Sequence, residues 1–141
     1  RLDDRFDEEH IVTHTQVRLK SQAVLDADEL RRQVADDTEV VGIDEAQFFD
    51  QSLVDVATEL AAQGRRVIVA GLDLDYRGEP FEPMPQLMAV SEYVSKQLAI
   101  CMVCGDHAHF SQRLTSSRAR IEVGAGETYE ARCRRHFYRP E

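Results

Sequence analysis

Two short apolar runs that flank one helical stretch constrain the fold of this chain more than any other feature. The runs lie near Glu39 to Ile43 and at Val67 to Gly71. Between them, Gln51 to Gln63 places its apolar residues on one helical stripe, and Gly64 follows as a C-terminal cap. Strand, helix, glycine and strand within about thirty residues predict a right-handed βαβ unit. We therefore expect an α/β fold with buried, parallel strands.

Carboxylates follow both predicted strands. Asp44 and Glu45 come directly after the first strand, and Asp73 follows the second. Because parallel strands open on the same edge of a sheet, where α/β proteins bind ligands, we expect these acids to meet there. Adjacent carboxylates at such an edge favour a site for magnesium and nucleotide. A solvated acidic turn after a buried strand produces the same pattern, so both interpretations stay open at this point.

Shorter elements surround this unit in the prediction. Asp73 to Pro85 is aperiodic and carries aromatic residues and prolines, which is typical of a ligand-binding loop. The other expected elements are short strands or extended loop over residues 1–25, a helix over Ala27 to Asp36 capped by Asp26, a short helix over Pro85 to Val90, a strand over Tyr93 to Ile100 and a hairpin around Gln112 to Val123.

The composition of the chain limits its size class and its partners. The 141 residues are enough for one domain and a small appendage. A formal net charge of −9 argues against a domain that wraps nucleic acid, since binding to the phosphate backbone requires concentrated basic side chains. We expect a cytoplasmic protein, and no apolar run approaches the about 18 residues of a membrane span.

Cysteine and histidine form two pairs of matching spacing, Cys101-x-x-Cys104 and Cys133-x-x-His136. Two chelating pairs of this kind are the ligand set of a closed, tetrahedral and therefore structural zinc site. Such a site contributes on the order of 10 kcal/mol to the folding of small zinc modules, enough to order a segment with little core. A redox C-x-x-C pair or unrelated buried cysteines are the alternatives, and a histidine closer to the first pair could replace His136.

Five motifs occur in the order and spacing of a known family. They are V-V-G-I-D-E-A-Q-F-F, V-I-V-A-G-L-D-L-D-Y-R-G-E-P-F, the C-x-x-C pair, S-Q-R-L and G-E-T-Y-E-A-R-C-R-R-H. Together with D-D-R-F near Asp3 they cover nearly the whole chain, which resembles the type II (cellular and bacterial) thymidine kinases. The resemblance implies a partial P-loop (RecA-like) parallel sheet core over residues 1–98 and a small zinc-binding lasso subdomain over residues 99–141.

The activity that the resemblance implies is transfer of the γ-phosphate of ATP to the 5′-hydroxyl of thymidine, in pyrimidine deoxynucleoside salvage. The implied cofactors are structural Zn²⁺ and Mg²⁺, with ATP as co-substrate, and the implied assembly is a homotetramer. In the family pattern Glu45 accepts the hydroxyl proton as general base, Asp44 holds magnesium through water, and Arg5 lies near the reacting groups. Arg5 could equally be a surface residue.

The resemblance also implies a thymine pocket. Aromatic walls suit a planar pyrimidine, and glycine permits close backbone approach to its hydrogen-bonding edge. Ordinary core packing is the alternative for the aromatic residues. The implied pocket consists of Phe48, Leu72, Tyr76, Phe81 and Tyr129 around the ring, Ser111 near its exocyclic edge, and the loop that contains Val123 and Gly124.

One family motif is missing from these 141 residues. No G-x-x-x-x-G-K-[ST] sequence is present, and without its amides and lysine the β- and γ-phosphates have no cradle. Either that motif precedes Arg1 in a longer protein, or the protein is a non-catalytic, zinc-stabilised binding or regulatory remnant. We expect the first, and we expect the 141-residue chain alone to be inactive.

Overall fold

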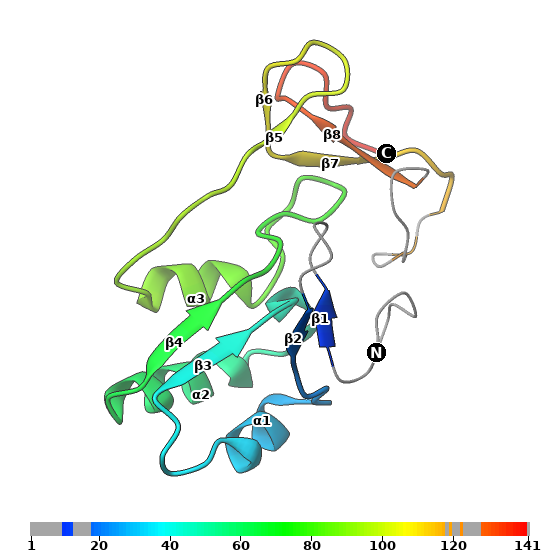
Figure 1. The fold of residues 1–141 in the computed structure, drawn as a ribbon. Helices are drawn as coiled ribbons and strands as arrows, with labels where there is room; N and C mark the ends of the chain where they lie inside the picture. Colours follow the sequence, from blue (N-terminus) through cyan, green and yellow to red (C-terminus); the bar gives the residue numbers. More distant parts are fainter. Residues whose placement is uncertain (1–9, 13–17, 118, 120–121, 123–127, 141) are drawn as a thin grey trace.

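The computed structural model describes residues 10–12, 18–117, 119, 122 and 128–140 (Figure 1). The described elements form a larger α/β body and a smaller group of short strands near the C-terminus. In chain order they are β1 His10–Val12, β2 Arg18–Lys20, α1 Ala27–Gln33, β3 Val40–Ile43, the 3-10 helix η1 Ala46–Phe48, α2 Ser52–Ala62, β4 Arg66–Val69, α3 Met84–Val90, β5 Ala99–Ile100, β6 His107–Ala108, β7 Phe110–Arg113 and β8 Tyr129–Arg132.

Strands β3 and β4 form a parallel pair, with α2 between them in the chain. Val41 lies opposite Val67, and Ile43 lies opposite Val69. Gly64 follows α2 with a φ of 87°, in the left-handed region that a C-terminal cap requires, so the predicted cap is confirmed. The predicted βαβ arrangement of strand, helix and parallel strand is therefore present, with element bounds shifted by a residue or two.

One face of the parallel pair carries the core. Val41 and Ile43 are buried on this face, in one cluster with residues of α1, α2 and α3. On the other face Val40 is 57% exposed and Ile68 is 53% exposed. Within the described residues, the expectation of fully buried strands is thus correct for one face only. The buried members of this cluster are Ala27, Val41, Ile43, Ala46, Leu53, Val56, Ala57, Leu60, Met84 and Leu87.

Leu53 on α2 tests this core directly, since its side chain is 0% exposed. We expect Leu53→Ala to lower the free energy of unfolding by about 2–5 kcal/mol, through lost burial and the cavity that remains. Urea denaturation followed by circular dichroism measures the loss. Leu25 is 87% exposed, so Leu25→Ala is the matched control and should change stability by less than about 0.5 kcal/mol. Equal losses in the two variants would contradict this description of the core.

The strand predicted over Tyr93 to Ile100 is wrong for most of its length. Only Ala99–Ile100 is a strand, β5, which pairs with β6 in an antiparallel hairpin. Tyr93 is 81% exposed, and the chain around it has no strand assignment. An extended apolar segment becomes a strand only where a neighbour exchanges backbone hydrogen bonds with it, and β6 is such a neighbour for the last two residues alone.

The hairpin predicted around Gln112 to Val123 is also wrong. Strand β7 pairs with β8 instead, in a register that places Gln112 opposite Glu130. Alternation along the chain indicates a strand but not its partner, and this partner comes after a long connection. Val123 lies outside the described residues.

The other expected elements are present. Helix α3 lies within a residue of its predicted start, whereas α1 ends at Gln33 and not at Asp36 because Val34 has extended backbone. Strands β1 and β2 form an antiparallel pair, in agreement with the short strands expected near the N-terminus. No helix in the described ranges is both long and apolar enough to cross a membrane.

Candidate active site and metal centre

The turn after β3 presents the two adjacent acids at the edge of the sheet. Glu45 has φ 53° and ψ 39°, which makes it the one described non-glycine residue with a positive φ. Two backbone bonds hold this turn against Ala70, directly after β4: Ala70 N donates to Ile43 O at 2.8 Å, and Ala46 N donates to Ala70 O at 3.0 Å. Within the turn, Glu45 N donates to Asp44 Oδ1 at 2.9 Å. Both carboxylates are exposed. A left-handed non-glycine residue costs on the order of 1–3 kcal/mol, so the contacts around the turn must hold it in this conformation.

The end of β4 lies beside this turn, as the parallel pairing predicts. Leu72 is 51% exposed. The Asp73 carboxylate makes an ion pair of 2.6 Å with Lys96 Nζ, from the segment after α3. Gln47 joins the segments that follow β3 and β4, because its amide oxygen accepts a hydrogen bond of 3.0 Å from Leu72 N.

An aromatic pair stands next to the acidic turn. The rings of Phe48 and Phe81 meet edge to face, with their centroids 6.2 Å apart. Phe48 is 43% exposed, whereas Phe81 and Tyr76 are buried. The structure thus brings η1 and the loop after β4 into contact, with Phe48 as the accessible ring.

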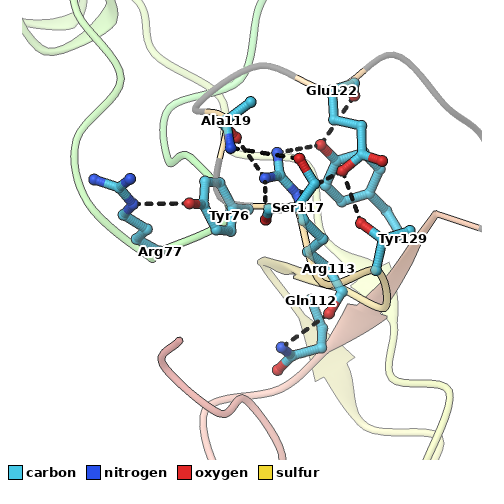
Figure 2. A network of polar contacts seen from close by, with 9 residues as sticks. Tyr76, Arg77, Gln112, Arg113, Ser117, Ala119, Glu122 and Tyr129 are labelled. Atoms are coloured by element: carbon cyan, nitrogen blue, oxygen red, sulfur yellow. Dashed lines mark hydrogen bonds and ion pairs between the residues drawn. The ribbon is translucent and has the colours of Figure 1, made fainter. Parts of the chain in front are cut away.

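A buried arginine connects that loop to the C-terminal strands (Figure 2). Arg113, on β7, has its guanidinium carbon 3.6 Å from the centroid of the Tyr76 ring. It donates 2.7 Å to Tyr129 Oη and 3.1 Å to Ser117 O, and it also bonds the Ala119 carbonyl. A planar group that stacks on an aromatic ring while its fork of donors binds several acceptors distinguishes arginine from lysine. Arg113 therefore holds the loop after β4, β8 and the segment after β7 in one network.

Tyr129 completes this network from β8. It lies opposite Arg113 in the β7–β8 register, and its hydroxyl donates 2.9 Å to Glu122 O. The Glu122 carboxylate is 3.4 Å from Arg113 Nε and accepts 2.7 Å from Thr115 Oγ1. The Tyr129 hydroxyl is therefore held both by Arg113 on β7 and by Glu122 in the connection between β7 and β8 (Figure 2).

The ligand atoms of Cys101, Cys104, Cys133 and His136 all lie within 4.8 Å of one another. The sulfurs of Cys104 and Cys133 are 3.8 Å apart, and His136 Nδ1 is 3.2 Å from the Cys133 sulfur and 3.9 Å from the Cys101 sulfur. With zinc–sulfur bonds of about 2.3 Å, tetrahedral geometry sets sulfur–sulfur separations of about 3.8 Å. The spacing fits one metal ion with four protein ligands, and the sulfurs are too far apart for a disulfide. Gly105, with φ 75°, makes the turn after the first pair and donates to Cys101 O at 2.9 Å.

The environment of the first cysteine pair suits thiolate ligands. Burial raises the pKa of the Cys101 thiol, but backbone N–H groups of Cys133, Val103 and Cys104 outweigh it and lower that pKa to about 6. For Cys104, the N–H of Asp106 lowers the thiol pKa, while burial and the neighbouring sulfurs raise it above the usual value overall. Two thiols that compete for ionisation are both stabilised as thiolates when a divalent cation lies between them.

The sequence model of the thymidine kinase family matches residues 1–137. The chain belongs to the thymidine kinase family. It is 54% identical over 140 residues to the thymidine kinase of Rhodothermus sp. (strain ITI 518), an alignment that covers 99% of this chain and 65% of that protein. It is 49% identical over 140 residues to the thymidine kinase of Bdellovibrio bacteriovorus, covering 99% of this chain and 68% of the relative. The chain thus spans about two thirds of the length of these relatives.

Only some residues of the thymidine kinase motifs lie close together in the described structure. The acids that follow β3 lie beside the end of β4, and Phe48 meets Phe81 of the loop after β4. Arg113 joins Tyr76 of the same loop to Tyr129. Ser111 is half-buried on β7. Three predicted site residues, Arg5, Val123 and Gly124, lie outside the described residues.

Sequence reasoning missed Gln47 and Arg113. Both stand inside the quoted family motifs, A-Q-F-F and S-Q-R-L, and both are buried polar side chains. The available signal is weak: a glutamine or arginine next to apolar residues, which local pattern alone reads as a surface position.

Proposed function

We propose that the whole protein is a thymidine kinase, which transfers the γ-phosphate of ATP to the 5′-hydroxyl of thymidine in cytoplasmic pyrimidine deoxynucleoside salvage. Membership of the thymidine kinase family over residues 1–137 carries this proposal. The two acids at the carboxyl edge of a parallel pair support it, since that edge is where α/β proteins bind nucleotides.

In this proposal the β3 turn supplies the chemistry. Glu45 accepts the proton of the 5′-hydroxyl as the oxygen attacks the γ-phosphorus, and Arg5 lies near the reacting groups. Asp44 holds Mg²⁺ through water, which suits a hard cation that prefers oxygen ligands and keeps part of its hydration shell. When bound, Mg²⁺ neutralises charge on the phosphate oxygens. Because Glu45 and Asp44 are both exposed, substrate and hydrated cation can reach them without rearrangement of the core.

The proposed thymine pocket uses the accessible side of the aromatic cluster. Its residues are Phe48, Leu72, Tyr76, Phe81, Ser111, Val123, Gly124 and Tyr129. Phe48 and Leu72, 43% and 51% exposed, are available to a ligand, whereas buried Phe81 and Tyr76 hold the pocket wall from behind. Among the aromatic residues, direct contact with a ligand is thus proposed for Phe48, and packing behind the pocket is proposed for Phe81 and Tyr76.

The larger architecture is part of the same proposal. We assign residues 1–98 to a RecA-like P-loop core and residues 99–141 to a lasso subdomain that a structural Zn²⁺ stabilises. The four-ligand cluster supports a closed site, because a tetrahedral ion with four protein ligands has no position left for substrate. The proposed assembly is a homotetramer.

Nucleoside-dependent release of ADP tests the proposed function. The full-length protein, with ATP, magnesium and thymidine, should form thymidine monophosphate and ADP in equal amounts. ADP release without nucleoside would instead indicate an ATPase, and no turnover in either condition would favour a non-catalytic, zinc-stabilised remnant. The 141-residue chain alone should show no turnover, because it contains no G-x-x-x-x-G-K-[ST] motif to cradle the phosphates.

Arg113 gives a prediction for the nucleoside side of the site. Arg113 reaches Ser117 O and Ala119 O from one terminal nitrogen and Tyr129 Oη from the other, whereas the three donors of lysine start from a single nitrogen and do not reproduce this spread. We expect Arg113→Lys to raise the KM for thymidine about tenfold, which corresponds to about 1.4 kcal/mol, with kcat within about threefold of wild type. Steady-state kinetics measure both constants. Arg31→Lys on α1 is the control, since Arg31 makes only exposed ion pairs and should leave both constants unchanged.

A further inference from the structure

The side-chain amide of Gln47 is buried, and both its N–H donor and its oxygen acceptor form hydrogen bonds. It lies on η1, two residues after Glu45, and is 3% exposed. Its Nε2 donates to Glu45 Oε2 at 2.5 Å, and its Oε1 accepts from Leu72 N at 3.0 Å. A primary amide is buried at low cost only when donor and acceptor are both satisfied, so this orientation is the one that the site favours.

Gly71, two residues after β4, leaves space for this amide. A Cβ at Gly71 would lie 2.7 Å from Gln47 Oε1 and 2.8 Å from Met84 Sδ. A larger residue at position 71 would force the Gln47 amide oxygen or the Met84 side chain to shift, since contacts below 3.0 Å are not tolerated. Gly71 thus leaves the room that the amide oxygen occupies, and Glu45 and Leu72 hold the amide at its two ends.

Gln47 bonds two groups, the Glu45 carboxylate and Leu72 N, and only the carboxylate is charged. The turn holds the Glu45 backbone in the left-handed region, but backbone geometry alone does not fix the rotation about its side-chain bonds. The bond from Gln47 removes that freedom and occupies Oε2, which leaves Oε1 to accept a proton. Asp44, the ionisable neighbour on the same turn, bonds Glu45 N through its own side chain.

We propose that Gln47 is the positioning residue of the site: its amide fixes the Glu45 carboxylate and directs Oε1 to the 5′-hydroxyl of the nucleoside. This inference rests on the proposed kinase function. A merely structural role is the competing explanation, in which Gln47 serves to join the ends of β3 and β4 through Leu72 N.

Gln47→Glu separates the two roles. A carboxylate of the same length keeps an acceptor for Leu72 N but has no N–H to donate to Glu45, and it places a like charge beside that carboxylate. In full-length protein we expect kcat at pH 7 to fall at least tenfold, with the KM for thymidine within about threefold. We also expect the acid limb of the kcat profile to move up by about one pH unit, since a neighbouring carboxylate favours protonation of Glu45.

The matched control is Gln51→Glu. Gln51 also donates its amide to a glutamate, at 2.8 Å to Glu82 Oε2, but on the exposed surface at the start of α2. The same change of charge there should leave kcat and the acid limb as in wild type. If Gln47→Glu behaves as this control does, while wild type is active, the positioning role is overturned.

Two further measurements keep the inference distinct from the kinase proposal. If full-length wild type turns over no nucleoside, the proposed function fails. Carbon-13 titration of the Glu45 carboxyl then tests whether Gln47 contacts this group. An upward shift of its midpoint in Gln47→Glu supports the contact, and an unchanged midpoint overturns it. Should Gln47→Glu not fold, Gln47→Met replaces it: a fall in kcat with retained KM supports positioning, and an unchanged kcat overturns it.

Discussion

Replacing Cys101 with serine will abolish binding of the proposed structural zinc and unfold the C-terminal strands, while the β3–β4 body stays folded. The buried cluster in that region consists of Cys101, Ala108 and Cys133, with Ala131 packed against it. Two of the three buried members belong to the four-residue Cys/His cluster, so in the proposed zinc site the metal takes the place of an apolar core. Structural zinc contributes on the order of 10 kcal/mol to folding in small modules, and the side chains left here cannot replace that energy.

Metal analysis and hydrogen exchange measure this outcome. Under reducing conditions wild type should hold one zinc per chain, and Cys101→Ser should hold less than about a tenth of that. Amide protection in β5 to β8 should disappear with the metal, and protection in β3 and β4 should persist. His107→Ala is the control, because His107 is exposed and lies outside the ligand cluster. Retained protection without metal would show that apolar packing, and not zinc, stabilises this part of the chain.

Replacing Glu45 with glutamine will remove most of the turnover of the full-length protein. Glutamine has nearly the same shape and can still accept a hydrogen bond from Gln47, but it cannot take a proton from the 5′-hydroxyl. General-base catalysis contributes about 10²–10⁴-fold, so we expect kcat to fall by that factor. The nucleoside contacts lie elsewhere in the proposed pocket, and the KM for thymidine should stay within about threefold of wild type.

Rapid-quench measurement of a single turnover distinguishes the chemical step from product release. Glu92→Gln, at an exposed position in the segment after α3, is the control and should leave the rate unchanged. If Glu45→Gln turns over thymidine as fast as this control does, Glu45 is not the base.

Much of the fold follows from local pattern. The apolar runs of β3 and β4, the amphipathic stripe of α2 and the glycine cap after it predicted a parallel pair that the structure confirms. The spacing of the cysteine and histidine pairs likewise identified the four residues that converge. Both patterns succeed because their physics is local: periodicity sets which side chains share a face, and two intervening residues let one turn direct two ligands at one ion.

Partner choice was not predictable in the same way. Residues 93–98 have the composition of a strand but no strand beside them in the described structure, and β7 selects β8 across a long connection. Pairing depends on which backbone groups are free nearby after the chain has folded, which alternation along the sequence does not encode.

The sequence by itself determined the βαβ unit, the four cysteine and histidine residues that converge, the acidic turn and the thymidine kinase family. Only the tertiary structure decided which polar residues support that site. Gln47 and Arg113 are separated by long stretches of chain from Leu72 and Tyr76, the groups that give each of them its role. A buried amide or guanidinium is stable only where distant backbone and side-chain groups satisfy it. That condition belongs to the folded molecule and not to any stretch of sequence.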